Sequence, residues 1–350
     1  MRYKLLGKSG LRVSELCLGT MTFGEEFGWG SSQETSRQIY DAFIEAGGNF
    51  IDTANEIYTG GTSEKFLGEF IASDRDRIVL ATKYTDSLPT NDPNRAGNQR
   101  KNMIQSVERS LKRLNTDYID LLWLHSWDFM TPVEEVMRAF DDLVRAGKVF
   151  YIGISDAPAW IVSRANALAE LRGWTPFIGL QVEYSLIQRT PERELLPMAR
   201  ALDIGVTGWS PLASGILTGK YSKQANGKDS TEQGRLEKAQ FAELSERNLA
   251  IADTVQQVAQ EIGCTPSQVA INWVRNKGII PILGATKVSQ IKDNLACLDF
   301  KLTEELIHRL DDVSQVELGF PHEFLASTRN ATYGGTFDLI DSHRDLTIPI

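Results

Sequence analysis

Short apolar runs rich in β-branched and aromatic residues recur along the chain and predict strands. Eight such runs follow one another, at residues 15–19, 49–52, 78–82, 118–124, 149–155, 178–181, 204–209 and 279–283. The segments between them have apolar residues at helical spacing, as at positions 103, 104, 107, 111 and 114 within residues 99–114. Such an alternation of strands and helices is typical of a parallel sheet.

The number and spacing of the predicted strands favour a closed (β/α)8 TIM barrel over an open, doubly wound sheet. The glycine pattern GxGxxG does not follow the first predicted strand, which weighs against a Rossmann domain. Residues 3–6 and 11–13 flank Gly7-Lys8-Ser9-Gly10 and predict a hairpin. We therefore expect one domain, with a hairpin plug at 1–14, the barrel at 15–313 and a C-terminal tail at 314–350.

Three segments interrupt the regular spacing and are expected to be loops. They span residues 88–98, 214–237 and 318–350. The first two follow predicted strands, and in a barrel such loops line the face that holds active sites, so we expect them to close over a ligand. For the tail, a cover over the pocket and an oligomer interface both remain open, as does the oligomeric state.

Composition and charge exclude several classes of protein. The 350 residues are 42% hydrophobic and 24% charged, as in an ordinary folded domain. A net charge of −9 without a basic stripe argues against nucleic acid as a partner. Since no apolar stretch approaches the roughly 20 residues of a membrane helix, we expect no membrane association and a cytoplasmic location. Three cysteines without a CxxC pair and four scattered histidines predict neither disulfides nor a metal site.

Polar residues at the ends of three neighbouring predicted strands are the candidates for catalysis. Asp52, Lys83 and His125 end the second, third and fourth strands, and Tyr58 lies six residues after Asp52. In a barrel these side chains converge at one rim. An ammonium group beside a phenol favours phenolate and makes Tyr58 a better acid, Asp52 would keep Lys83 charged, and His125 could orient a carbonyl group. The set suits proton transfer to a carbonyl oxygen.

A reduction also needs a hydride, which these side chains cannot supply, so a cofactor is implied. Ser155, Asp156 and Gln181 follow the fifth and sixth strands and could bind an amide such as nicotinamide carboxamide, on which Trp209 could stack. After the eighth strand, residues 284–287 lead into a helix and suit a phosphate such as the 2′-phosphate of NADP. Structural interpretations also remain open: Trp209 as barrel core, Ser155 and residues 284–287 as helix caps.

Together the motifs resemble those of the aldo-keto reductase superfamily from about residue 6 to residue 339. The segments that carry the resemblance are LGKSGLRVS at 6–14, LGTMTFG at 18–24, NFIDTA at 49–54, ATK at 81–83, YIDLLWLH at 118–125, GISD at 153–156, QVEYSL at 181–186, WSPLASG at 209–215, TPSQVA at 265–270 and GAT at 284–286. The resemblance implies NADP(H)-dependent reduction of an aldehyde or ketone to the alcohol.

The resemblance also implies roles for individual residues. Asp52, Tyr58, Lys83 and His125 would be the catalytic tetrad, with Tyr58 donating the proton. The implied cofactor-binding residues are Gly19, Thr20, Met21, Ser155, Asp156, Gln181, Trp209, Ser210, Pro211, Leu212, Gly215, Lys220, Gly284, Thr286, Lys287, Gln290 and Asn294.

The sequence departs from the family pattern at three places. The tyrosine usually lies five residues after the aspartate, but here Ile57 has that place, so that either the turn bulges by one residue to aim Tyr58 inward or catalysis is impaired. Asp156 replaces the usual asparagine, and Lys287 stands where an arginine is often found. The altered spacing favours one alternative, a cofactor-binding regulatory subunit resembling potassium-channel β subunits.

A barrel isomerase that binds phosphate, or a glycosidase with paired carboxylates, would need a second acid near Asp52, which the sequence does not place convincingly. Bulky residues on the loops suggest a substrate site that accepts apolar or aromatic groups, and packing at the barrel mouth is the alternative. The residues that could line the pocket are Met21, Phe23, Ile57, Trp127 and Phe129.

Overall fold

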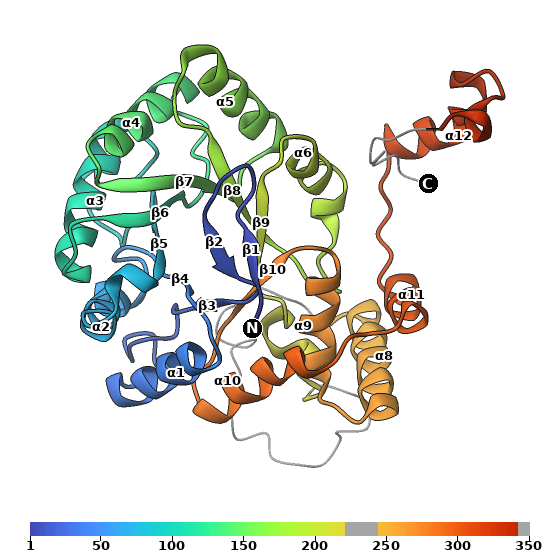
Figure 1. Cartoon of the computed structure of the whole chain (residues 1–350), viewed down its shortest axis with the longest axis horizontal. Helices are drawn as coiled ribbons and strands as arrows, with labels where there is room; N and C mark the ends of the chain where they lie inside the picture. The colour runs from blue at the N-terminus through green and yellow to red at the C-terminus, as the bar shows by residue number, and fades with distance from the viewer. Residues whose placement is uncertain (221–243, 342–350) are drawn as a thin grey trace.

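A computed structural model describes residues 1–220 and 244–341, and in it eight parallel strands close into a barrel (Figure 1). The strands are β3 (Cys17–Gly19), β4 (Phe50–Asp52), β5 (Val79–Tyr84), β6 (Ile119–Leu124), β7 (Val149–Ser155), β8 (Phe177–Glu183), β9 (Gly205–Trp209) and β10 (Ile280–Leu283). β10 pairs with both β3 and β9, which closes the ring. The predicted (β/α)8 barrel is confirmed.

Helices cover the outside of the barrel (Figure 1). They are α1 (Gln33–Glu45), α2 (Thr62–Phe70), α3 (Arg100–Leu114), α4 (Val133–Arg145), α5 (Ala159–Arg172), α6 (Leu195–Ala201), α8 (Glu246–Ile262), α9 (Pro266–Asn276), α10 (Val288–Leu295) and α11 (Glu304–Val313). Short 3-10 segments are η1 (Thr59–Gly61), η2 (Arg75–Arg77), η3 (Thr190–Glu192), η4 (Ala213–Thr218) and η6 (Ala296–Asp299). The helix boundaries follow local signals, since α9 begins with Thr265 and Gln268 in a capping box and Pro266 at its first position.

The inside of the barrel is filled by side chains. Trp123 of β6 is fully buried, and a Cβ atom added to Gly153 or Gly179 would lie 2.3 or 2.7 Å from its ring. The predicted hairpin is present as β1 (Tyr3–Leu5) and β2 (Arg12–Ser14), and the fully buried Leu6 packs in the same cluster as Trp123. A Cβ on Gly7 would lie 2.4 Å from the carbonyl oxygen of Ile178, so the hairpin turn lies against the start of β8.

Two of the three predicted loops contain helical structure. The segment 88–98 has neither helix nor strand, whereas η4 occupies the beginning of the predicted loop 214–237, whose remainder from 221 lies outside the described residues. The expectation of a loop over 318–350 is wrong, because it contains α12 (His322–Thr332) and η7 (Phe337–Leu339). Residues 322–332 contain neither Gly nor Pro, so nothing within them interrupts a helix. Residues 342–350 are not described.

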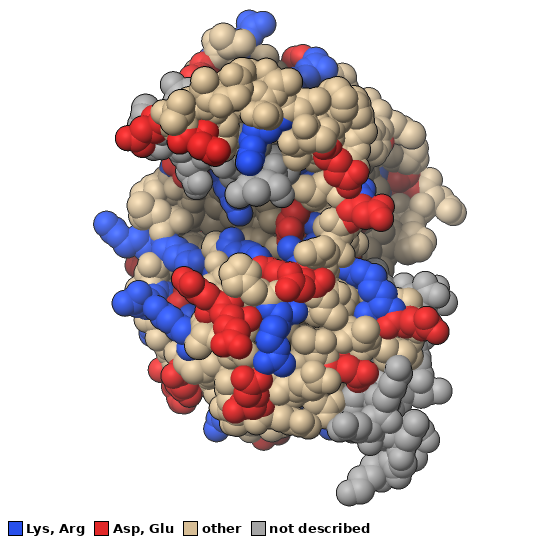
Figure 2. Space-filling model, turned by 90° about the vertical axis from the view of Figure 1, so that its right-hand side faces the viewer, with Lys and Arg blue, Asp and Glu red and all other residues tan. Residues whose placement is uncertain are grey.

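The surface has charges of both signs. Figure 2 shows Lys and Arg side chains interspersed with Asp and Glu over the face that it displays. Within the described ranges, no helix has the length and apolar character needed to cross a membrane. Across those ranges, too, His, Cys, Asp and Glu side chains form no group of three that could hold a metal ion.

Candidate active site

An ion pair between Lys83 and Asp52 lies at the centre of the predicted catalytic set. Asp52 ends β4, and Lys83 lies one residue before the end of β5, in a strand that runs two residues beyond its predicted end. The Lys83 ammonium contacts the Asp52 carboxylate and donates to the carbonyl oxygen of Thr53 at 2.8 Å, and both side chains are buried. Burial lowers the pKa of Lys83, but Asp52 and Tyr58 outweigh it and the pKa is raised. Lys83 is therefore charged at neutral pH.

Tyr58 lies beside this pair despite the longer spacing. Its ring centroid is 5.1 Å from Lys83 Nζ and 6.1 Å from the ring of His125, which it meets edge to face. Asn55 shapes the loop, because its side-chain oxygen accepts from the Ile57 N–H at 3.1 Å and its carbonyl accepts from the Tyr58 N–H at 3.1 Å. This turn accommodates the additional residue and directs Tyr58 toward Lys83.

His125 follows the last residue of β6 and carries no charge at neutral pH. Burial and the nearby Lys83 lower the pKa of His125 to about 3. Its Nδ1 lies 3.2 Å from Asp86 Oδ2, but the two atoms do not meet with hydrogen-bond geometry. A neutral imidazole has one N–H donor and one acceptor nitrogen, so His125 can donate to a carbonyl oxygen without supplying a net charge.

Polar side chains of β7 and β8 face the same region. Gln181 does not follow its strand as expected, because β8 continues to Glu183. Gln181 donates to Asp52 Oδ1 at 3.0 Å and so connects the two halves of the barrel mouth. Ser155 is the last residue of β7, and α5 is capped by Pro158, so the interpretation of Ser155 as a helix cap is wrong. Its buried hydroxyl lies close to Asp156 but has no partner with good hydrogen-bond geometry. Such a group is available for a ligand amide.

Asp156 lies between Ser155 and the indole of Trp209. Trp209 Nε1 donates to Asp156 Oδ1 at 3.2 Å, and Trp209 is half-buried at the end of β9. Burial raises the pKa of Asp156 to about 6, and the hydrogen bond from Trp209 and the nearby Ser155 hydroxyl oppose that rise. Asp156 has a positive φ of 41°, a conformation that Asp and Asn tolerate better than most residues.

The remaining cofactor candidates follow β3, β9 and β10. The Thr20 N–H and hydroxyl both bond to the Asp52 carbonyl, next to Gly19 and the half-buried Met21. Ser210 to Gly215 form a tight turn that contains Pro211 and Leu212 and leads through η4 to the exposed Lys220. Gln290 Oε1 accepts from the N–H groups of Thr286 and Lys287 at 2.8 and 3.2 Å and caps α10. Gly284 and Lys287 are exposed, and Asn294 is buried.

These residues fit a nicotinamide cofactor. The unpartnered Ser155 hydroxyl, the Gln181 amide and the Asp156 carboxylate offer the donors and acceptors that a carboxamide needs, and Trp209 offers a flat ring beside them. The exposed Lys287 precedes the first turn of α10, where an anion is favoured.

The predicted pocket walls are only partly at the surface. Phe23 is fully buried and packs against Phe70 with ring centroids 6.3 Å apart, so it belongs to the core and not to a pocket. Trp127 is 9% exposed, Phe129 is 70% exposed, and Met21 and Ile57 are intermediate.

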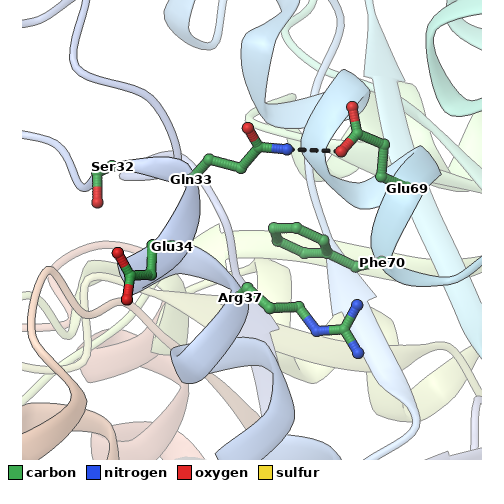
Figure 3. Close-up of a pocket in the computed structure, with 6 residues that line it drawn as sticks. All are labelled: Ser32, Gln33, Glu34, Arg37, Glu69 and Phe70. Carbon is green, nitrogen blue, oxygen red and sulfur yellow. Dashed lines mark hydrogen bonds between the residues drawn. The ribbon is translucent and has the colours of Figure 1, made fainter.

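A separate surface depression of about 620 Å³ lies between α1 and α2 (Figure 3). Ser32, Gln33, Glu34, Arg37, Glu69 and Phe70 line it, and Gln33 Nε2 donates to Glu69 Oε2 at 2.5 Å. Its lining includes no residue of the predicted site.

Residues 15–315 match the family model described as the aldo/keto reductase family. The chain belongs to this family. It is 40% identical to a norsolorinic acid reductase of Aspergillus flavus over 94% of this chain and 85% of that protein. It is also 36% identical to an aryl-alcohol dehydrogenase of Pestalotiopsis microspora over 93% of this chain and 85% of that protein. An uncharacterized oxidoreductase of Bacillus subtilis is 37% identical over 89% of this chain and 96% of its own length.

The names of the relatives favour an enzyme over a regulatory subunit. The relatives named above are oxidoreductases, and the family acts on aldehydes and ketones with nicotinamide cofactors. The protein is therefore an aldehyde or ketone reductase of this family. No sequence motif marks Asn55 or Asp86. Asn55 belongs to the tyrosine loop and donates to the carbonyl oxygen of Asp86, 31 residues away, and the Asp86 side chain lies beside His125.

Proposed function

We propose that the protein reduces an aldehyde or ketone to the alcohol with NADPH, and that Tyr58 donates the proton. The observation that carries the proposal is the position of Tyr58 beside the buried, charged Lys83 and the neutral His125. When bound, the reduced nicotinamide supplies the hydride.

Each member of the tetrad has a separate task. The Lys83 ammonium stabilises the phenolate that remains when the Tyr58 hydroxyl gives its proton to the carbonyl oxygen. Asp52 keeps Lys83 protonated in its buried position and accepts from Gln181, which orients the carboxylate. His125 donates its N–H to the same carbonyl oxygen and orients the substrate.

Cofactor binding is assigned to the polar ends of the other strands. Ser155, Asp156 and Gln181 would bind the carboxamide, and Trp209 would stack on the nicotinamide ring. The rest of the cofactor would be surrounded by the turn from Ser210 to Gly215 and by Gly19, Thr20, Met21 and Lys220. The preference for NADP over NAD rests on the exposed Lys287 at the start of α10, with Gly284, Thr286, Gln290 and Asn294 beside it.

The substrate class that we favour is an aromatic aldehyde or ketone. Two relatives are named for norsolorinic acid and for aryl alcohols. Ile57, next to Tyr58 in the chain, is partly exposed and supplies apolar surface. We also propose a cytoplasmic location, which the three free cysteines support.

The proposal is tested by mixing purified protein with NADPH and a panel of aldehydes and ketones and following the absorbance of the reduced cofactor. Wild type should oxidise NADPH in the presence of aromatic aldehydes, and Tyr58→Phe should lower kcat by roughly 100- to 10,000-fold. The variant should still bind NADPH, as measured by quenching of tryptophan fluorescence. Tight binding of NADPH by wild type without turnover of any carbonyl compound would favour the regulatory subunit instead.

A further inference from the structure

A buried carboxylate lies two residues before Tyr58 and faces three arginines. The Glu56 side chain is 10% exposed. Its Oε1 lies 3.3 Å from Arg95 and 3.6 Å from Arg109, and its Oε2 lies 3.3 Å from Arg113. An isolated carboxylate at this depth would be costly, and the three guanidinium groups offset that cost.

Arg113 extends these contacts toward the catalytic lysine. Its Nε donates at 2.6 Å to Glu64 of α2, which is fully buried. Glu64 Oε1 in turn accepts from the hydroxyl of Thr82 at 2.7 Å. Thr82 precedes Lys83 in β5. Two ion pairs and one hydrogen bond therefore connect the loop that carries Tyr58 with the strand that carries Lys83. We call Glu56, Arg95, Arg109, Arg113 and Glu64 the Glu56 cluster.

The longer tyrosine loop needs such a connection. Asn55 defines the turn on one side of Glu56, and η1 begins at Thr59, after Tyr58. Between them, Glu56 is buried while Ile57 and Tyr58 are only partly so. The fixed position of Glu56 limits where the next two residues can point.

We propose that Glu56 is a positioning residue for the reduction: its contacts with Arg95, Arg109 and Arg113 hold the tyrosine loop, residues 53–58, so that the Tyr58 phenol faces Lys83 and His125. The expected effect on kcat rests on the proposed function. The position of the Tyr58 phenol does not depend on turnover.

Removing the charge of Glu56 should release the loop. Glu56→Gln leaves Arg95, Arg109 and Arg113 close together with less opposing charge, and their mutual repulsion favours separation. A displacement of Tyr58 by about 1 Å can lower the rate by about 100-fold. Movement away from Lys83 also removes the interaction that favours phenolate.

The experiment compares wild type with Glu56→Gln, Glu56→Asp and the control Glu134→Gln. Glu134 of α4 pairs with Arg164 at 2.6 Å, and both side chains are about half exposed, so this variant loses an ion pair that shares no residue with the Glu56 cluster. Four quantities are measured for each protein: Tm, the Kd for NADPH, kcat with an aromatic aldehyde, and the titration of Tyr58. The titration is the difference in phenolate absorbance between each protein and the same protein carrying Tyr58→Phe.

For Glu56→Gln we expect kcat to fall by roughly 10- to 100-fold and Tyr58 to titrate at a pH higher by roughly half a unit or more. The Kd for NADPH should stay within about twofold, Glu56→Asp should retain part of kcat, and Glu134→Gln should match wild type. A folded Glu56→Gln with wild-type kcat and wild-type Tyr58 titration overturns the proposal.

Two further outcomes are also decisive. If Glu56→Gln does not fold, Glu56→Asp decides, because its shorter side chain retains the charge but not the reach; wild-type kcat and titration in that variant overturn the proposal. If wild type reduces no carbonyl compound, the proposed function fails. The Tyr58 titration then still supports or overturns the positioning role, because it requires neither cofactor nor substrate.

Discussion

At the scale of single residues, the interaction of Lys83 with Asp52 combines stability with chemistry. Both side chains are buried, and each charge is stabilised mainly by the opposite charge of its partner. Breaking a buried ion pair leaves one charge without its partner, whereas replacing both charges together removes the cost of burying them. The free energy of unfolding can therefore distinguish a variant that removes one of the two charges from a double variant that removes both.

Lys83→Met should lower the free energy of unfolding by about 3–5 kcal/mol and abolish carbonyl reduction. Asp52→Asn combined with Lys83→Met should recover much of that stability without recovering activity, because no charge is then buried at this position. Urea titrations with matched activity assays measure both effects. A double variant less stable than Lys83→Met would contradict this account of the pair.

Asp156 should make the stability of the protein depend on pH. Its pKa in the folded protein is raised from 3.8 to about 6, so the folded state binds more protons than the unfolded state between these values. The stabilisation contributed by this group is present below pH 3.8 and is lost as pH rises toward 6. The Tm of Asp156→Asn relative to that of wild type should therefore increase as the pH rises over this interval. Asparagine can still accept from Trp209, and a constant Tm difference would argue against the shifted pKa.

At the scale of elements, the barrel depends on small residues in strands that surround a large one. Trp123 of β6 fills the space that the missing side chains of Gly153 in β7 and Gly179 in β8 leave. Protein interiors are packed closely enough that one additional methyl group at such a contact displaces its neighbours. The match between these strands is thus a steric requirement of barrel closure.

Gly153→Ala should lower the free energy of unfolding by about 1–3 kcal/mol, because the new Cβ would lie 2.3 Å from the Trp123 ring. Gly10→Ala provides the matched control, since a Cβ at Gly10 meets nothing within 4 Å. Chemical denaturation of both variants measures the difference. Equal stability of the two would show that Trp123 can shift at little cost.

At the scale of the whole molecule, the described tail contributes little to the barrel. α12 has no buried residue and stands apart from the other helices in Figure 1, whereas Leu310 of α11 is fully buried. His322 contacts Glu194 at 3.2 Å, and Arg193 donates to the carbonyl of Glu317, so contacts with the barrel occur near the start of the tail. The part of the chain that folds as one cooperative unit is therefore expected to end close to α11.

Leu325→Ser should change the free energy of unfolding by less than about 0.5 kcal/mol, since Leu325 of α12 is 52% exposed. Leu310→Ala should cost about 2–5 kcal/mol. The two variants are compared by thermal unfolding at several protein concentrations. A large loss for Leu325→Ser would place α12 within the folding unit or an interface.

The sequence by itself determined the barrel strands and placed β5 and β8 with ends that fall short of the observed ones at Tyr84 and Glu183. Hydrophobic periodicity is local, and strands that alternate with helices have few ways to pack, so the barrel and the common rim for Asp52, Lys83 and His125 followed. The hairpin followed as well, because its turn residues are adjacent in the chain. The tail was predicted wrongly: residues 318–350 follow the last predicted helix and interrupt the regular spacing, which suggested a loop, but residues 322–332 contain no helix breaker.

Only the tertiary structure decided how the site is assembled. The direction of Tyr58 depends on Asn55, Lys83 and the Glu56 cluster, and Gln181 reaches Asp52 from a position 129 residues away in the chain. The assignment of Phe23 to the core and the exclusion of Ser155 as a helix cap also required the packed barrel. Local patterns fix which residues lie on one element, whereas contacts between distant elements fix where each side chain points, because those contacts form only when the chain is folded.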